Sequence, residues 1–149
     1  DILGNQKLLD LYKRLDKAQL EINSLDVKIK WLLGEVNKAS TGYTAYSRNI
    51  CDVVPSFLKI HKDKYGEAEK RYLDALAEEK SLIKYYERIS AEVKQYVISN
   101  CVPQQYRKTA IVSHKPFDNF VTMSYYLDEE SRKEGITLRL YLSDENTSM

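Results

Sequence analysis

The sequence predicts a mainly α-helical chain, in which long coiled-coil-like helices form a helical hairpin or bundle, followed by a small C-terminal antiparallel β-hairpin. Three observations predict this fold class. Apolar residues recur at alternating steps of three and four along two long segments. Only 5 Gly and 3 Pro occur among 149 residues, so long regular elements are expected. After Pro103 the apolar period falls to two, which is typical of strands.

The first helix is predicted from Leu3 to Ala39, because its apolar residues form an unbroken a/d heptad stripe. The Ala39–Gly42 run is expected to end this helix. Further apolar residues outside the stripe predict contact with more than one neighbouring helix. The a positions are Leu8, Leu15, Ile22, Ile29 and Val36, the d positions are Leu11, Ala18, Leu25 and Leu32, and the further residues are Leu9, Leu20, Val27, Trp31 and Leu33.

Two more helices are expected before the strands. A short one continues the helical spacing from Tyr43 to Val54, and Pro55 predicts a break or kink after it. Ser56 is expected to cap the third helix, which runs to about Asn100.

The seam of the third helix has unusual residue types. It carries Tyr65, Tyr72, Tyr86 and Tyr96 where a zipper prefers Leu or Ile, and Glu79 interrupts it. Glu79 either lies at an open edge of the seam or fixes the register by pairing with a Lys or Arg. The long helices can fold back antiparallel within one chain or pair with a second chain, and the pattern leaves both arrangements open.

The C-terminal segment predicts a β-hairpin with one apolar face. Apolar and polar residues alternate over 121–127 and again over 136–142, and a polar linker ending in Gly135 joins the two runs. Because an isolated hairpin is marginally stable in water, the apolar face must lie on a helix or on a partner. We therefore expect a helical region over residues 1–102 and a hairpin head and tail over residues 103–149.

Composition excludes several classes of protein. Lys and Arg number 23 against 22 Asp and Glu, so the net charge of +1 provides no global attraction for nucleic acid. The sequence contains no apolar run of about 18 residues, so no transmembrane helix is expected. Cys51 and Cys101 lie too far apart for a CxxC motif, which favours a reducing, cytoplasmic location. The chain begins at Asp1, so we expect a processed or excised fragment.

No motif predicts an enzyme, a cofactor or a metal centre. Nucleotide-binding, nucleophile-elbow and zinc-protease patterns are absent from the sequence. Cys51 with His61 or His114 would be a nucleophile pair only by chance, and both thiols are expected to be buried. The adjacent acids Glu78 and Glu79 point to different faces of a helix and are expected to be solvated.

The basic residues Lys59, Lys62 and Lys64 form the strongest local cluster. The Lys-, Tyr- and Glu-rich helix that contains them is similar to helices of BAR-type membrane-curvature domains, and this resemblance implies an alternative function as a peripheral membrane module. The order of coiled coil and small head is also similar to kinetochore and cytoskeletal adaptor subunits, which implies a rod that dimerises and a head that docks partners.

The expected function is a non-enzymatic scaffold for protein–protein interaction. The heptad stripes would serve homo- or hetero-oligomerisation, and the C-terminal hairpin would dock a protein partner. A membrane surface is the less favoured partner, and nucleic acid is not expected. The predicted assembly residues are Leu8, Leu11, Leu15, Ile22, Leu25, Ile29, Leu32, Val36, Tyr72 and Tyr86.

Overall fold

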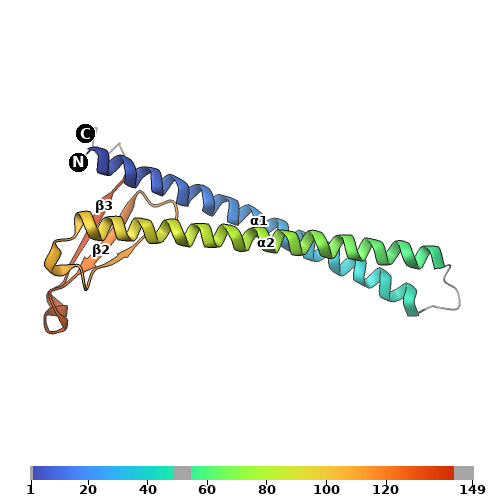
Figure 1. The fold of residues 1–149 in the computed structure, drawn as a ribbon. Helices are drawn as coiled ribbons and strands as arrows, with labels where there is room; N and C mark the ends of the chain where they lie inside the picture. Colours follow the sequence, from blue (N-terminus) through green and yellow to red (C-terminus); the bar gives the residue numbers. More distant parts are fainter. Residues whose placement is uncertain (1, 49–54, 143–149) are drawn as a thin grey trace. The chain divides into compact units, whose positions relative to one another are not determined.

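The computed structural model describes residues 2–48 and 55–142 and contains two long helices and a small sheet (Figure 1). The helices are α1 (Ile2–Arg48) and α2 (Pro55–Cys101), and the strands are β1 (Ile111–Ser113), β2 (Phe120–Tyr125) and β3 (Ile136–Tyr141). Two short 3-10 helices, η2 (Gln104–Tyr106) and η3 (Glu129–Glu134), lie in the connections. The mainly helical class and the C-terminal antiparallel hairpin are confirmed.

The contacts divide the chain into two compact units. The sheet unit combines Asp1–Gln19 with Lys84–Met149, and the hairpin unit is Leu20–Ile83. This division differs from the predicted boundary between residues 102 and 103, because the first part of α1 and the last part of α2 belong to the same unit as the sheet. The predicted domains stay a prediction.

In the hairpin unit, α1 and α2 pack side by side in antiparallel directions (Figure 1). The carboxyl of Asp26 lies beside that of Glu79, and further along α1 the ring of Tyr43 contacts the ring of Tyr65. Later residues of α1 thus lie beside earlier residues of α2, as in an antiparallel pair. The seam between them buries Leu25, Leu32 and Ala75. In this unit, the heptad stripe of α1 therefore packs against α2 of the same chain.

The prediction that α1 stops at Ala39–Gly42 is wrong, because the helix continues to Arg48. Gly42 costs about 1 kcal/mol of helix propensity relative to Ala. Packing against α2 outweighs this cost, since a Cβ at position 42 would already lie 3.4 Å from Nδ1 of His61. The hydroxyl of Thr41 also donates to the carbonyl of Asn37, which is within the helix.

The predicted separate helix from Tyr43 to Val54 is likewise not observed as such. Its first residues, to Arg48, belong to α1, and residues 49–54 lie outside the described residues. The break at Pro55 is confirmed, because α2 begins there. Pro suits the first position of a helix, where its missing N–H has no carbonyl to bond. Ser56 therefore lies inside α2, and the prediction that it precedes the helix as a cap is wrong.

The core of the sheet unit is built from the first part of α1, the last part of α2 and one face of the sheet. Leu15, Val97 and Val121 are almost completely buried in it. The strand order is β1-β2-β3, and both pairs are antiparallel. Sequence analysis predicted only β2 and β3, and the short apolar run near Val112 supplies β1 as a third strand. The core residues are Leu8, Leu11, Tyr12, Leu15, Ile89, Val93, Val97, Val102, Val112, Val121, Met123 and Tyr125.

The pairing of β2 with β3 gathers the alternating apolar residues on one face of the sheet, as the sequence predicted. Val121 pairs with Leu140 and Met123 with Leu138, so these side chains share the face that packs on the helices. β3 is an edge strand and is covered less than β2, because Leu138 on this face stays 44% exposed and Ile136 42%.

Candidate interaction surfaces

Half of the predicted assembly residues are buried inside the chain. Leu8, Leu11 and Leu15 are buried in the sheet unit, and Leu25 and Leu32 are buried in the hairpin unit. The others are only half-buried, which leaves part of each side chain accessible. These are Ile22, Ile29, Val36, Tyr72 and Tyr86.

The hairpin unit carries an apolar surface beside its seam, which we call the lateral strip. Successive helical residues turn by about 100°, so Leu33 lies roughly 80° from Leu25, the centre of the α1 seam. On α2, Ile83 lies roughly 80° from Ala75 in the same rotational sense. Because the two helices are antiparallel, rotation in the same sense about each helix axis, counted from its seam residue, leads to the same side of the helix pair. The strip consists of Ile22, Ile29 and Leu33 from α1 and Tyr72, Leu76 and Ile83 from α2.

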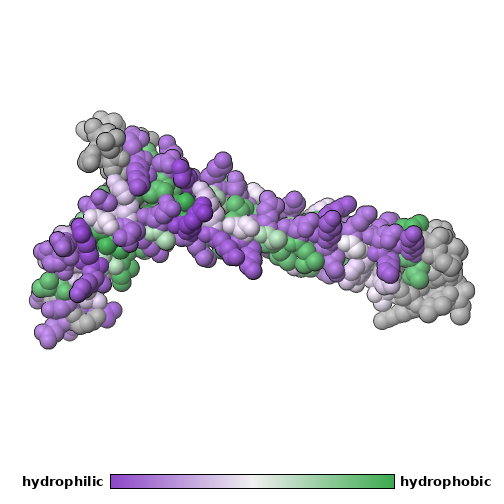
Figure 2. Space-filling model, in the orientation of Figure 1, coloured by the Kyte–Doolittle hydropathy of each residue, from purple (hydrophilic) through white to green (hydrophobic). Residues whose placement is uncertain are grey.

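Two side chains of the lateral strip are substantially exposed. Leu33 and Ile83 are 41% and 39% exposed, respectively. Figure 2 shows apolar side chains on the surface of the hairpin with hydrophilic side chains around them. The further apolar residues in the sequence had predicted an additional helical neighbour, and the two-helix hairpin does not supply one for this strip.

Two acidic residues lie at the edge of the lateral strip. A hydrogen bond with the carboxyl of Asp26 raises the pKa of Glu79, and burial of the Glu79 carboxyl and the charge of Asp26 act in the same direction. Oε2 of Glu79 is buried without a hydrogen-bond partner. Of the two alternatives for Glu79, pairing with a Lys or Arg is not found among the described residues of the single chain. Among the ion pairs of the described residues, none involves Asp26 or Glu79.

The opposite side of the hairpin has a hollow of about 350 Å³. It is bordered by Trp31 and lies over the small residues Ala39, Gly42 and Ala68. Lys64 of the predicted basic cluster borders it, and Lys59 and Lys62 are exposed elsewhere on α2. Acidic residues accompany the basic ones here, since Glu67 pairs with Arg71 at 4.0 Å and Glu35 with Lys38 at 3.7 Å. The charge of this surface is therefore mixed.

In the sheet unit, the loop between β1 and β2 is held against α1. Oδ1 of Asp16 accepts a hydrogen bond from the backbone N–H of Phe117 at 3.1 Å, and Phe117 has a positive φ of 71°. The ring of His114 meets the ring of Tyr12 edge-on, with 4.1 Å between centroids. Burial lowers the pKa of His114. Sequence analysis missed Asp16, because it lies off the heptad stripe and is 101 residues away from Phe117.

Tyr12 combines a buried ring with an unsatisfied hydroxyl. Its Oη is buried and has no hydrogen-bond partner. Burial raises the pKa of Tyr12, and Tyr86 and the charge of Asp16 raise it further. The pKa of Tyr86 is also raised, by burial and by Asp16. Both phenols are therefore neutral over the ordinary range of pH.

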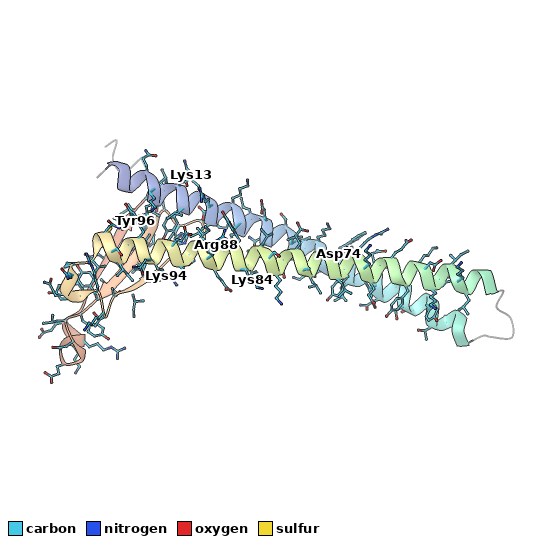
Figure 3. All side chains as sticks on the ribbon, in the orientation of Figure 1. Lys13, Asp74, Lys84, Arg88, Lys94 and Tyr96 are labelled. Carbon is cyan, nitrogen blue, oxygen red and sulfur yellow. The ribbon has the colours of Figure 1, made fainter. Side chains whose placement is uncertain are left out.

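Other charged and aromatic residues of the sheet unit lie on its surface. Tyr96 is on the side of α2 that faces the first part of α1, and Nζ of Lys7 lies 5.4 Å from the centre of its ring (Figure 3). Lys84 and Lys94 project from the opposite side of α2 (Figure 3). The guanidinium of Arg88 lies over the ring of Tyr85 at 5.1 Å.

Within residues 2–48 and 55–142, no group of three or more His, Cys, Asp or Glu side chains is placed to hold a metal ion. In the same part of the chain, neither α1 nor α2 has a stretch apolar enough to span a membrane. Cys101 is a free, half-buried thiol whose pKa is raised by burial, as expected for a buried thiol. Cys51 and the Asn146–Ser148 acceptor pattern lie outside the described residues.

Comparison of the chain with protein-family models, with curated proteins and with solved structures found no match. The function is therefore argued from the surfaces of the two units.

Proposed function

We propose that this chain is a non-enzymatic, cytoplasmic scaffold whose hairpin unit pairs with the hairpin unit of a second copy through the lateral strip. One observation carries the proposal: Leu33 and Ile83 remain 41% and 39% exposed on one side of a hairpin whose seam is already filled. A contiguous exposed apolar surface on a protein is typical of an interaction site.

The energy for pairing comes from burial of the lateral strip. Removing apolar surface from water contributes about 25 cal/mol per Å², or about 1.5–3 kcal/mol for a Leu or Ile side chain that is fully buried. Leu33 and Ile83 are about two-fifths exposed, so each contributes roughly 1 kcal/mol on pairing. Two copies bring twice that number of side chains to one interface.

The charges at the edge of the strip favour a second copy as the occupant. Lys80 follows Glu79 on α2, so it lies level with Asp26 along the hairpin. Both Asp26 and Lys80 are exposed, and neither has an oppositely charged partner within the described residues. A two-fold axis parallel to the hairpin would bring Lys80 of the second copy to Asp26, and the reverse pair would form by symmetry.

The same two-fold axis also brings apolar residues of the two copies to the same level along the hairpin. It stacks α1 of one copy on α2 of the other in antiparallel directions, as in a four-helix bundle. Counting from the Asp26–Glu79 contact in steps of about 1.5 Å per residue gives the levels of the other pairs. Ile22 lies level with Ile83, Ile29 with Leu76 and Leu33 with Tyr72. The lateral strip is thus complementary to itself.

Docking of a protein partner by the C-terminal hairpin belongs to the same proposal. It is supported by the position of β3 at the edge of the sheet, with Ile136 and Leu138 exposed on the apolar face. Edge strands present unpaired backbone groups that a further strand can use.

The test is the solution mass, measured by light scattering on a sizing column over a concentration series. We expect a dimer for the unmodified chain and a monomer of unchanged helicity for Leu33→Glu. Leu20→Glu is the matched control, because Leu20 is the same residue type, is 57% exposed and lies on the other side of the hairpin unit. A monomeric unmodified chain, or equal effects of the two substitutions, would contradict the proposal.

The alternative function, a BAR-like peripheral membrane module using Lys59, Lys62 and Lys64, stays a prediction. The acidic residues around Lys64 weaken it, because Glu35 and Glu67 border the same hollow. Cosedimentation with anionic vesicles at low salt tests it, since electrostatic attraction to lipid is strongest there.

A further inference from the structure

The outer face of the sheet has a hollow of about 320 Å³. Its floor is a row of residues across the three strands, because Ser113 pairs with Thr122 and Thr122 pairs with Arg139. This row lies on the face opposite to the core, since its neighbours Val112 and Val121 are buried. The lining residues are Ser113, His114, Lys115, Asp118, Phe120, Thr122 and Arg139.

The polar groups of the hollow are mostly hydrogen-bond donors without partners. Lys115 and Arg139 have no carboxylate partner within the described residues, and the hydroxyls of Ser113 and Thr122 make no hydrogen bond there. The guanidinium of Arg139 lies 4.4 Å from the centre of the Phe120 ring. Stacking of this kind leaves the N–H edges of the guanidinium free to donate. Asp118 is the one carboxylate of the lining, against two cationic side chains.

The hollow is fixed in shape before any ligand arrives. The backbone N–H of Asp118 donates to the carbonyl of Lys115 at 3.2 Å, which closes the turn that carries both residues. Nε2 of His114 lies 3.4 Å from the carbonyl oxygen of Asp118, and the turn is tied to α1 through Asp16 and Phe117. Thr122 and Arg139 stand on paired strands. Preorganised donors of this kind bind without a large ordering cost.

We propose that this hollow binds a phosphate monoester, with Arg139 and Lys115 on the phosphate oxygens and the organic part of the ligand against Phe120. Arginine donates two parallel hydrogen bonds to a phosphate, lysine adds a point charge, and hydroxyls complete the shell. A volume of about 320 Å³ is at the lower end of the range for small-molecule sites, and it leaves room for more than the phosphate group. The site goes beyond the scaffold function, because it lies in the sheet unit.

The experiment is a titration of the full ¹⁵N-labelled chain with inorganic phosphate, at ionic strength held constant with sodium chloride. We expect saturable shifts of the amides from Ser113 to Asp118 and of Thr122 and Arg139. Arg139→Gln should weaken phosphate binding by about tenfold. Arg139→Lys should weaken it by less, because Lys keeps the positive charge and loses only the two parallel N–H donors of the guanidinium. Arg88→Gln is the matched control, because Arg88 is an exposed arginine stacked on Tyr85 in the same unit.

Phosphoserine, as the free amino acid and within a blocked peptide, then distinguishes the two sources of the ligand. Equal affinities assign the site to a small phosphate ester, and tighter binding of the peptide assigns it to a phosphorylated protein. The proposal is overturned if phosphate causes no saturable shift beyond that of chloride, or if Arg139→Gln and Arg88→Gln weaken binding equally. The amide spectrum of Arg139→Gln verifies that the variant remains folded.

Discussion

Replacing Tyr12 by Phe is expected to stabilise the chain, although Tyr12 is a core residue. The phenol oxygen is buried and has no hydrogen-bond partner, whereas the ring packs edge-on against His114. Phe keeps the ring and its contact and removes only the hydroxyl. The substitution therefore relieves the cost of taking a polar group out of water.

The size of the effect follows from this cost. An unsatisfied buried hydrogen-bonding group costs about 1–3 kcal/mol. Tyr12 is neutral at ordinary pH, because burial raises its pKa, so no charge has to be included. We take the lower end, because the ring of Tyr12 is partly surrounded by polar residues such as His114, and expect about 1 kcal/mol. For a chain of 149 residues this raises the melting temperature by about 2–4 °C.

Urea unfolding followed by circular dichroism measures the difference in the free energy of unfolding. Tyr141→Phe is the control, because Tyr141 is 49% exposed, and no change is expected there. A loss of stability in Tyr12→Phe would refute the reasoning, since it would mean that the hydroxyl donates or accepts a hydrogen bond in solution.

Three further predictions concern the core and the titrating groups. Leu15→Ala should lower the free energy of unfolding by about 2–5 kcal/mol in urea titrations, because Leu15 is only 1% exposed, and a smaller loss would show that the site collapses around the cavity. Glu79→Gln should raise the melting temperature at pH 7. Because the pKa of Glu79 is raised, its contribution to the free energy of unfolding is favourable at low pH and is lost as pH rises through that pKa. The stabilisation by Gln should therefore vanish in acid. Because the pKa of His114 is lowered, its contribution to the free energy of unfolding is present above the ordinary His pKa and is lost as pH falls. His114→Gln should therefore remove part of the fall in stability between about pH 7 and pH 5. An unchanged pH profile of stability would contradict this. The neighbouring carboxylates Asp16 and Asp118 oppose the lowering and limit its size.

The parts of the fold that follow from backbone geometry were predictable from the sequence. A helix repeats every 3.6 residues and a strand every two, so any buried face imposes its period on the apolar residues. The heptad stripe therefore identified Leu15, Leu25 and Leu32 as buried, and the alternation after Pro103 identified the face that carries Val121 and Met123.

The parts that depend on long-range packing were not predictable. Gly42 indicated a helix end, but its cost of about 1 kcal/mol is small against the contacts of a helix that packs along its length. The partner of Glu79 depends on the register of the whole hairpin, and a shift of one residue on either helix would have placed a different side chain beside it. The hydrogen bond from Phe117 to Asp16 joins residues that share no local pattern.

The heptad stripe alone could not separate a hairpin within one chain from a pair of chains, because a and d residues are buried equally well in both. The apolar residues outside the stripe do separate them. In the single chain, Leu25 and Leu32 are buried and the surface that holds Leu33 and Ile83 is not. If the a/d residues were the interface between copies, Leu33→Glu would leave the dimer intact and Leu25→Glu would dissociate it into folded monomers. We expect the reverse, a folded monomer for Leu33→Glu and loss of helicity for Leu25→Glu, because the seam holds the hairpin and the lateral strip holds the pair.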